Sequence, residues 1–304
     1  MRGEDEMELE LKEIAPEIFL LKVAVPISEE SVNLYVFRGE VPTLIDAGTN
    51  TPAVFQEIQE GLKQLGIKQL EQVLGTHWHV DHIGGTESLW KAGARIITGT
   101  RDYEEWSGFY RGETFDLFRR WAEVEWGVPP AEMTIMLKVY DRLRALASLP
   151  DEVQVIEPDT LITAGNIQLK AIHTPGHTVG HLSFYEPERQ LLFSGDMLLP
   201  TQIPYPGIWV EDGQLVSGMP SYMKSLDCLE ELNPRCYFPA HGQPQGMAAD
   251  RCQEVRAQIH KQVERHIPLG TVYEGALRQV KGKNNPAAMF MQLHYVYGWE
   301  KLKG

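Results

Sequence analysis

The sequence predicts an α/β fold with two β-rich halves, a helical insertion between them and a helical extension after them. Three observations support this prediction. Short apolar runs typical of strands lie on both sides of the insertion, a strand–helix–strand order occurs near the N-terminus, and long stretches have helical spacing. We therefore predict a main domain over residues 1–245, with the insertion at about 101–149, and a helical extension over residues 246–304.

The N-terminal half begins with strands and then changes its period. Pro52 stands at a suitable first helical position, and apolar residues follow on one helical face as far as Gly66. The strand that comes next completes a strand–helix–strand unit. Strands are expected at residues 18–25, 32–37, 43–45 and 72–74.

The insertion is rich in Trp, Glu, Arg and Met at helical spacing, and the pair Pro129-Pro130 divides it into two parts. The β pattern returns after it. Strands are expected at residues 153–156, 167–172, 182–185, 191–193 and 236–238. Helices are expected at 221–232 and from Ala248 onward, because apolar residues recur there on one face.

The composition is globular, with 43% hydrophobic residues, and it argues against several classes of protein. The net charge of -14 disfavours nucleic acid as a partner, although bound cations can reverse the sign inside one cleft. The three cysteines lie outside any CxxC pair, so we expect free thiols. The acidic N-terminal segment has no apolar signal region and no long apolar run exists, so we expect a cytoplasmic protein without membrane contact.

The segment HWHVDH at residues 77–82 carries most of the chemical information. Because alternate residues of an extended segment point the same way, His77 and His79 can aim at one point. Asp81 and His82 then face a second point as the chain turns towards a Gly-Gly pair. Imidazole nitrogens and carboxylate oxygens suit zinc, iron or manganese. A histidine-rich surface loop is the alternative interpretation.

Three further residues of ligand type follow predicted strands, namely His177, Asp196 and His241. Active sites of α/β proteins collect at the carboxyl ends of strands. A single histidine at such a position is more often structural, but together with the HWHVDH segment these residues indicate a shared metal site. Three other histidines have no partner at ligand spacing and are expected to be surface or core residues: His260, His266 and His294.

In this order, the HxHxDH motif, the TPGHTxGH and SGD contexts and a final histidine resemble the metallo-β-lactamase superfamily over about residues 14–245. The resemblance implies a four-layer αββα sandwich, in which two sheets lie face to face with helices outside. It also implies a centre of two divalent metal ions, for which we expect zinc, with iron and manganese as alternatives. His77, His79 and His177 would hold the first ion, Asp81, His82 and His241 the second, and Asp196 would bridge both.

The resemblance further implies that a water or hydroxide between the ions is the nucleophile, with Asp81 as the catalytic residue that orients it or accepts a proton. Asp46 in the LIDAG segment would support the ligand loop, and a turn cap at a strand end is its equal alternative. We expect His173 and His181 to be structural or to support ligands. Tyr205 and Trp209 can line a substrate pocket, with plain loop packing as the alternative.

The ligand set favours hydrolysis of a small acyl compound, either a thioester, an ester or a lactone. True β-lactamases are disfavoured because they usually carry Cys or Ser where this chain has Asp196. Flavodiiron oxidoreductases are disfavoured because they have Glu in place of His79. Glyoxalase II, a thioester hydrolase, is similar in its ligand set, but its basic glutathione-binding pattern is missing here.

Two alternatives to the acyl hydrolase remain. Residues 248–280 look similar to a group of lactamase-like hydrolases that includes an endoribonuclease, so RNA cleavage is one alternative. A non-hydrolytic metal-binding module is the other. We expect a small molecule as the partner. The insertion and the helical extension are candidate interface elements for a homodimer.

Overall fold

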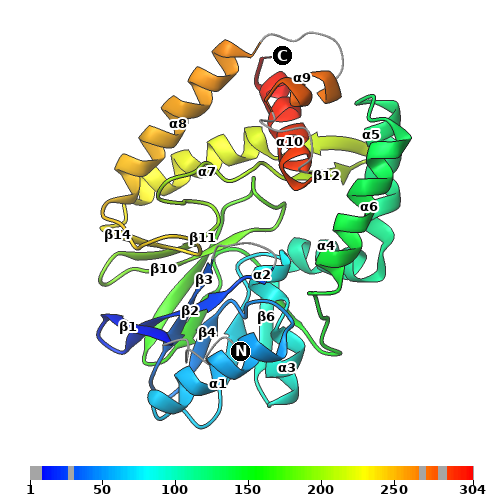
Figure 1. Cartoon of the computed structure of the whole chain (residues 1–304). Helices are drawn as coiled ribbons and strands as arrows, with labels where there is room; N and C mark the ends of the chain where they lie inside the picture. The colour runs from blue at the N-terminus through cyan, green and yellow to red at the C-terminus, as the bar shows by residue number, and fades with distance from the viewer. Residues whose placement is uncertain (1–8, 27–30, 267–271, 280–285, 304) are drawn as a thin grey trace, which may run out of the picture.

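The computed structural model describes residues 9–26, 31–266, 272–279 and 286–303, so the first eight residues of the acidic N-terminal segment lie outside it. Two β-sheets lie face to face, with helices on the outer side of each (Figure 1). The four-layer αββα sandwich implied by the resemblance is thus confirmed, and so is the helical C-terminal extension.

The first sheet contains seven strands in the order β1-β2-β3-β4-β5-β6-β7. Strands β1 to β4 pair antiparallel, and β4 to β7 pair parallel. The bounds are β1 Glu10–Ala15, β2 Ile18–Ala24, β3 Ser31–Phe37, β4 Thr43–Ile45, β5 Gln72–Leu74, β6 Arg95–Gly99 and β7 Gln154–Ile156. Because β4 and β5 are parallel, Asp46 and the HWHVDH segment leave the sheet at the same edge.

The second sheet has the order β14-β11-β10-β9-β8. The bounds are β8 Leu161–Ala164, β9 Ile167–His173, β10 Leu182–Glu186, β11 Leu191–Gly195 and β14 Cys236–Pro239. Strands β11 and β14 are parallel neighbours, with Phe193 opposite Phe238. Asp196 and His241 therefore follow adjacent strand ends. A separate hairpin pairs β12 Ile208–Glu211 with β13 Gln214–Ser217.

Alternation along the strands separates the two sides of the first sheet. In β2, Leu20 packs into the core between the sheets, and Leu21 packs towards the outer helices. The aromatic centre of the inter-sheet core includes Phe193, which stacks on Phe238 with ring centroids 5.1 Å apart. Helices α1 Pro52–Gln64 and α3 Thr86–Lys91 cover the outer face.

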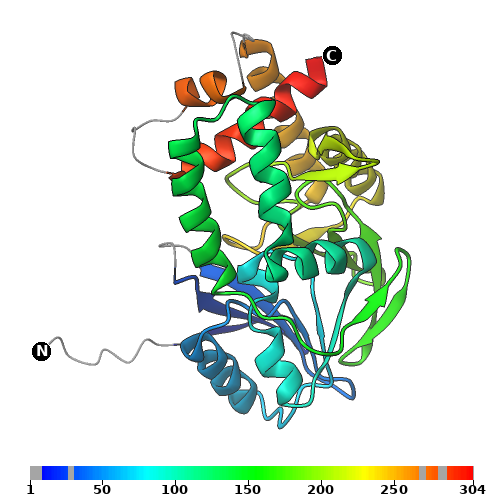
Figure 2. The same ribbon diagram turned by 90° about the vertical axis from the view of Figure 1, so that its right-hand side faces the viewer.

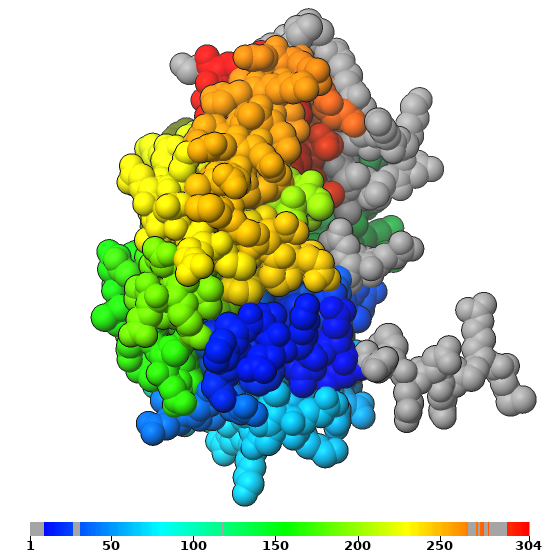
Figure 3. Space-filling view, turned by 90° about the vertical axis from the view of Figure 1, so that its left-hand side faces the viewer, coloured from blue at the N-terminus to red at the C-terminus, as the bar shows by residue number. Residues whose placement is uncertain are grey.

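Helices α7 Met219–Leu232 and α8 Ala248–Arg265 cover the outer face of the second sheet. Leu226 on α7 and Val255 and Ile259 on α8 belong to the same core as Leu192 on β11. Helix α8 forms the outer surface next to α7 in the space-filling view (Figure 3). These helices match those expected at 221–232 and from Ala248 onward.

The insertion forms three helices rather than the two that Pro129-Pro130 predicts. They are α4 Thr100–Arg111, α5 Glu113–Val124 and α6 Pro130–Arg144. The additional break lies at Gly112, whose positive φ of 82° ends α4 in the left-handed region. Helices α5 and α6 stand side by side, and α10 crosses near them (Figure 2).

The C-terminal extension returns to the insertion. Helix α10 Pro286–Lys303 contacts α6, α7, α8 and α9 Val272–Gln279. In the part of the chain that the structure describes, no helix combines the length and apolar character needed to cross a bilayer. All three cysteines are free, as expected.

Candidate metal centre

The HWHVDH segment begins in extended backbone and ends in a helical turn. Nε2 of His77 lies 3.0 Å from Nδ1 of His79, so these two rings meet at one point, as alternation predicts. The short helix α2 Val80–Ile83 starts directly after His79. This turn directs Asp81 and His82 to a second point. The Gly-Gly pair that follows allows close backbone approach, because a Cβ atom at Gly84 would lie 2.4 Å from the carbonyl oxygen of Leu146.

The first point is a group of three imidazoles. His177, in the turn after β9, places Nε2 2.9 Å from Nδ1 of His79. His77, His79 and His177 thus form one of the groups that can hold a metal ion. Burial, reinforced by the neighbouring histidines, lowers the pKa of His77 and His79 well below its usual range. The rings are neutral near pH 7, so their nitrogen lone pairs are available to a cation.

The second point combines a carboxylate with two imidazoles. Oδ2 of Asp81 lies 3.4 Å from Nε2 of His241 and 3.8 Å from Nε2 of His82. Burial opposes charge here, but the facing carboxylates outweigh it and raise the pKa of His82 to about 9 and that of His241 to about 10. The same pairing lowers the pKa of Asp81 despite its burial. A cation bound to this group would replace the protons on the two rings.

Asp196 lies between the two groups and presents one oxygen to each. Its Oδ2 is 3.3 Å from Nε2 of His177, and its Oδ1 is 3.5 Å from Nε2 of His241 and 3.6 Å from Nε2 of His82. Nε2 of His82 and Oδ1 of Asp196 are buried and have no hydrogen-bond partner within the described part of the chain. Buried polar atoms are normally paired. These facing nitrogen and oxygen donors therefore fit a divalent cation.

Three histidines of the cluster are oriented by hydrogen bonds from Nδ1, on the side of the ring that faces away from the cluster. The contacts are His82 to Asp46 Oδ2 at 2.8 Å, His177 to the Tyr205 carbonyl oxygen at 2.9 Å, and His241 to the Ser31 carbonyl oxygen at 2.9 Å. Carbonyl and carboxylate oxygens only accept, so each ring carries its hydrogen on Nδ1. Their Nε2 atoms consequently face the cluster, and a bound cation would take the place of any proton there.

Asp46 combines both roles that the sequence suggests for it. It ends β4 with a positive φ of 61°, as a turn residue does. Its carboxylate accepts hydrogen bonds from the backbone NH of Thr76 at 2.8 Å and from Nδ1 of His82. This buried carboxylate therefore connects the end of β4 with the HWHVDH segment and orients one of its rings.

Two residues support the cluster in ways that the sequence shows only in part. Asp102 on α4, which sequence reasoning missed, accepts hydrogen bonds from the backbone NH groups of Trp78 and Gly180 and from the hydroxyl of Thr178. It thereby joins the loops that carry His79 and His177. An Asp in the first turn of a helix is common, so the sequence gives no signal for this role.

His181 positions Asp196, which agrees with a supporting role. Its Nε2 accepts the backbone NH of Asp196 at 3.2 Å, and its Nδ1 faces the hydroxyl of Thr174 at 2.9 Å. The intervening Gly195 has a φ of 52°, and a Cβ atom there would lie 2.7 Å from Nε2 of His181. His173 ends β9, and its Nε2 contacts the carbonyl oxygen of Val179, in keeping with a structural role.

A cavity of about 940 Å³ opens onto the cluster and is lined by His79, Asp81, His177, Asp196 and His241. Its other walls come from the insertion, from the loop after the SGD motif and from helices α8 to α10. Tyr205 and Trp209 are among its lining residues, as the sequence suggests.

The C-terminal helix contributes a histidine that sequence reasoning assigned to the surface or core. His294 on α10 is buried beside this cavity, where Nδ1 donates to the carbonyl oxygen of Pro206 at 2.8 Å. Its ring meets that of Tyr205 edge to face, with centroids 5.5 Å apart. Of the other outlying histidines, His260 is exposed and His266 is buried next to Glu300.

A family model described as the metallo-beta-lactamase superfamily matches residues 27–241, which is most of the chain and includes every candidate ligand. The chain belongs to the metallo-beta-lactamase superfamily. This membership agrees with the two facing sheets and with the histidine and aspartate cluster at their edge, which can bind metal.

Several superfamily relatives are similar to this chain. The probable metallo-hydrolase YqjP from Bacillus subtilis is 27% identical, over 75% of this chain and 72% of the relative. A hydroxyacylglutathione hydrolase from Cereibacter sphaeroides is 30% identical, over 51% of this chain and only 46% of the relative. A solved metallo-beta-lactamase family protein from Thermus thermophilus has a TM-score of 0.82 and 24% identity, with 95% of each chain covered, which shows the shared fold.

Proposed function

We propose that this protein is a hydrolase that uses two divalent metal ions to cleave a small acyl compound, either a thioester, an ester or a lactone. The observation that carries the proposal is the position of Asp196, whose two oxygens face two separate groups of ligand-type side chains. Membership of the superfamily and the names of YqjP and of the hydroxyacylglutathione hydrolase support a metallohydrolase. We propose zinc as the ion, since imidazole and carboxylate groups suit it.

In the proposed centre, His77, His79 and His177 hold one ion and Asp81, His82 and His241 hold the other, with Asp196 shared. Two bound ions would supply a water molecule of lowered pKa and would stabilise the negative charge that develops on the attacked carbonyl oxygen.

Asp81 is the group best placed to handle the proton of that water. Its side chain is 22% exposed compared with 11% for Asp196, and it lines the cavity. An oxygen of Asp81 that faces the cavity can orient a water molecule and accept a proton from it. The cavity itself has a volume typical of a small-molecule site.

The decisive experiment is a hydrolysis assay with protein that has been loaded with zinc and shown to hold two ions per chain. Glutathione thioesters, acyl-coenzyme A thioesters, neutral esters and lactones are offered in turn. We expect turnover of at least one acyl compound, loss of turnover with a chelator and recovery with zinc. The variant His260→Ala, which removes an exposed histidine on α8, is the control and is expected to keep the turnover of wild type. No turnover of any acyl compound by the loaded protein would refute the proposal.

A further inference from the structure

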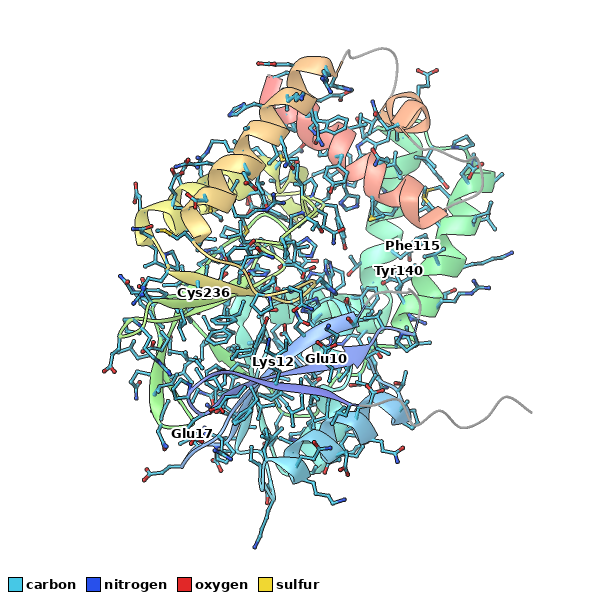
Figure 4. The ribbon with its side chains drawn as sticks, turned by 60° about the vertical axis from the view of Figure 1, so that its left-hand side comes forward. Glu10, Lys12, Glu17, Phe115, Tyr140 and Cys236 are labelled. Carbon is cyan, nitrogen blue, oxygen red and sulfur yellow. The ribbon has the colours of Figure 1, made fainter. Side chains whose placement is uncertain are left out.

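One wall of the large cavity is almost entirely apolar. Helices α5 and α6 of the insertion contribute Phe115, Phe118, Met136, Val139, Tyr140 and Leu143 to the lining. Phe115 and Tyr140 face each other across the two helices, with ring centroids 4.8 Å apart (Figure 4).

The C-terminal helix, the loop after the SGD motif and strand β12 add further apolar residues to the lining. Tyr295 and Trp299 lie on α10, Ile203 on the loop and Trp209 on β12. Glutamines of α8, α9, α10 and the loop also line the cavity, namely Gln202, Gln258, Gln262, Gln279 and Gln292. An acyl chain that lies along the apolar residues would contact mostly carbon atoms. Removal of such a chain from water is favourable in proportion to the apolar area that it buries.

The polar groups of three of the lining residues are engaged outside the cavity. The Tyr140 hydroxyl donates to the carbonyl oxygen of Phe109 at 3.1 Å, and the Tyr295 hydroxyl donates to that of Ile203. Nδ1 of His294 donates to the carbonyl oxygen of Pro206. These three side chains therefore have no free hydroxyl or Nδ1 hydrogen for a ligand, whereas the indole nitrogens of Trp209 and Trp299 have no hydrogen-bond partner among the described residues.

Charge gives the strongest restriction on the occupant. Among the described residues that line the cavity, none is Lys or Arg. Among these described lining residues, Glu105 has the one carboxyl group outside the cluster, and burial raises its pKa. An anionic group held in the apolar part would lose its hydration without gaining a cationic partner, which is costly.

We infer that the substrate is an uncharged compound whose reacting carbonyl group carries a long apolar chain, and that this chain binds along the apolar lining residues of α5, α6 and α10. This inference rests on the proposed hydrolase function and adds the substrate class. In the thioester case, water oxygen bonds to the carbonyl carbon, the carbon–sulfur bond breaks, and the departing thiolate takes up a proton. The products are a fatty acid and a thiol.

Acyl thioesters of N-acetylcysteamine test the inference, because this leaving group is neutral and constant. The acetyl, hexanoyl and decanoyl compounds are compared with the decanedioyl monothioester, which ends in a carboxylate. We expect kcat/KM to rise by about fourfold for each added methylene group until the cavity is filled. We expect the decanedioyl compound to be slower than the decanoyl compound by roughly 100-fold. Equal values over the series, or a preference for the carboxylate, would overturn the inference.

A pair of variants on α6 tests where the acyl chain of the substrate binds. Val139 is half-buried and lines the cavity, whereas Leu137 on the same helix is exposed and does not line it. Val139→Asp is expected to reduce the ratio of decanoyl to acetyl kcat/KM by at least ~10-fold, because a charge would stand beside the chain. Leu137→Asp is expected to leave both values unchanged. An unchanged ratio in folded Val139→Asp protein would contradict this placement.

A binding measurement separates failure of the inference from failure of the proposed function, and it remains informative if Val139→Asp does not fold. Decanamide, acetamide and the monoamide of decanedioic acid, whose carboxylate lies at the far end of the chain, are titrated into wild-type protein by calorimetry. We expect decanamide to bind more tightly than both others by at least about tenfold. Decanamide binding without any acyl hydrolysis would refute the function alone. Hydrolysis without chain-length dependence and without decanamide binding would refute the inference alone.

Discussion

The hydroxyl group of Tyr205 lies 3.1 Å from Nε2 of His79, while Nδ1 of the same ring faces His77 and His177. His79 therefore faces the cluster with Nδ1, whereas His177 faces it with Nε2. Burial raises the pKa of Tyr205, so the hydroxyl group stays protonated and its oxygen can accept the Nε2 hydrogen of His79. Tyr205 thereby positions His79 with a lone pair on Nδ1.

Tyr205→Phe should weaken metal binding without unfolding the protein. The phenyl ring keeps the packing against His177 and His294, but the acceptor for His79 is lost. Removal of such a supporting partner costs about tenfold to 100-fold in metal affinity. Competition with a chromophoric chelator measures this affinity, and Tyr110→Phe on the exposed side of α4 is the matched control. An affinity equal to that of wild type would show that Tyr205 does not position His79.

Asp196→Ala should leave one metal ion per chain and remove most activity. The alanine takes away the oxygen that faces His177 and also the oxygen that faces His82 and His241. Metal content is measured by elemental analysis after dialysis, and Asp151→Ala at an exposed loop position is the control. Two retained ions with full turnover would disprove the shared position of Asp196.

Asp46→Asn should impair the centre although the side chain keeps its shape. Asn tolerates the positive φ at this position, so the turn itself is preserved. The amide oxygen is still needed as the acceptor for the backbone NH of Thr76, so the amide nitrogen faces His82. This nitrogen cannot accept the Nδ1 hydrogen of His82, and the ring therefore favours the tautomer that has its hydrogen on Nε2, on the cluster side. We expect a loss of metal affinity of about tenfold to 100-fold. If affinity is unchanged while Asp196→Ala loses an ion, Asp46 does not orient His82.

Stability should depend on pH through His294. Burial lowers its pKa to about 4, compared with 6.5 for the unfolded chain, so folding favours the neutral ring. This contribution is fully present above pH 6.5 and is lost as the pH falls from 6.5 through 4, and its size is on the order of 3 kcal/mol.

His294→Asn is the matching variant, because its amide can donate to the carbonyl oxygen of Pro206. Urea unfolding of metal-free protein at pH 7, 6, 5 and 4 should show a flatter slope for His294→Asn than for wild type. His260→Asn at an exposed position should keep the wild-type slope. Parallel curves for wild type and His294→Asn would contradict the expected role of His294.

Metal removal should lower the melting temperature. Ions that bind the folded cluster and not the unfolded chain add about 4 kcal/mol when the free ion exceeds its dissociation constant about 1,000-fold. Calorimetric scans with chelator and after return of zinc should differ by several degrees and should be reversible. An unchanged melting temperature after confirmed removal of the ions would show that the cluster does not couple binding to folding.

The sequence predicts the central strands and the cluster residues for the same physical reason. Buried strands such as β5 and β11 are short apolar runs, and the ligand-type residues follow them at positions where polar groups are otherwise rare. The edge strands β1 and β8 and the hairpin β12–β13 were missed, because their exposed residues break the apolar pattern. The central strand β6 was missed as well, although all but its first residue are buried. Gly112 was missed as a helix end because a single glycine is tolerated inside helices.

The long-range contacts of the site were beyond prediction. The residues next to them in the sequence do not indicate that Asp102 joins two loops or that the ring of His294 contacts Tyr205. Both contacts depend on where distant helices pack. The apolar residues of α10 do not form one stripe, because this helix contacts α6, α7, α8 and α9 on several sides. A periodicity argument looks for one buried face and therefore gives no orientation for such a helix.

The apolar lining from α5, α6 and α10 and the candidate ligands come from separate stretches of the chain. The apolar side chains of α5, α6 and α10 belong to segments that contribute none of the seven ligand positions. Substitutions in these segments can therefore diversify during evolution while the reactive centre is inherited intact. Engineers can use the same division, since libraries restricted to α5, α6 and α10 would change selectivity and leave the reaction chemistry alone.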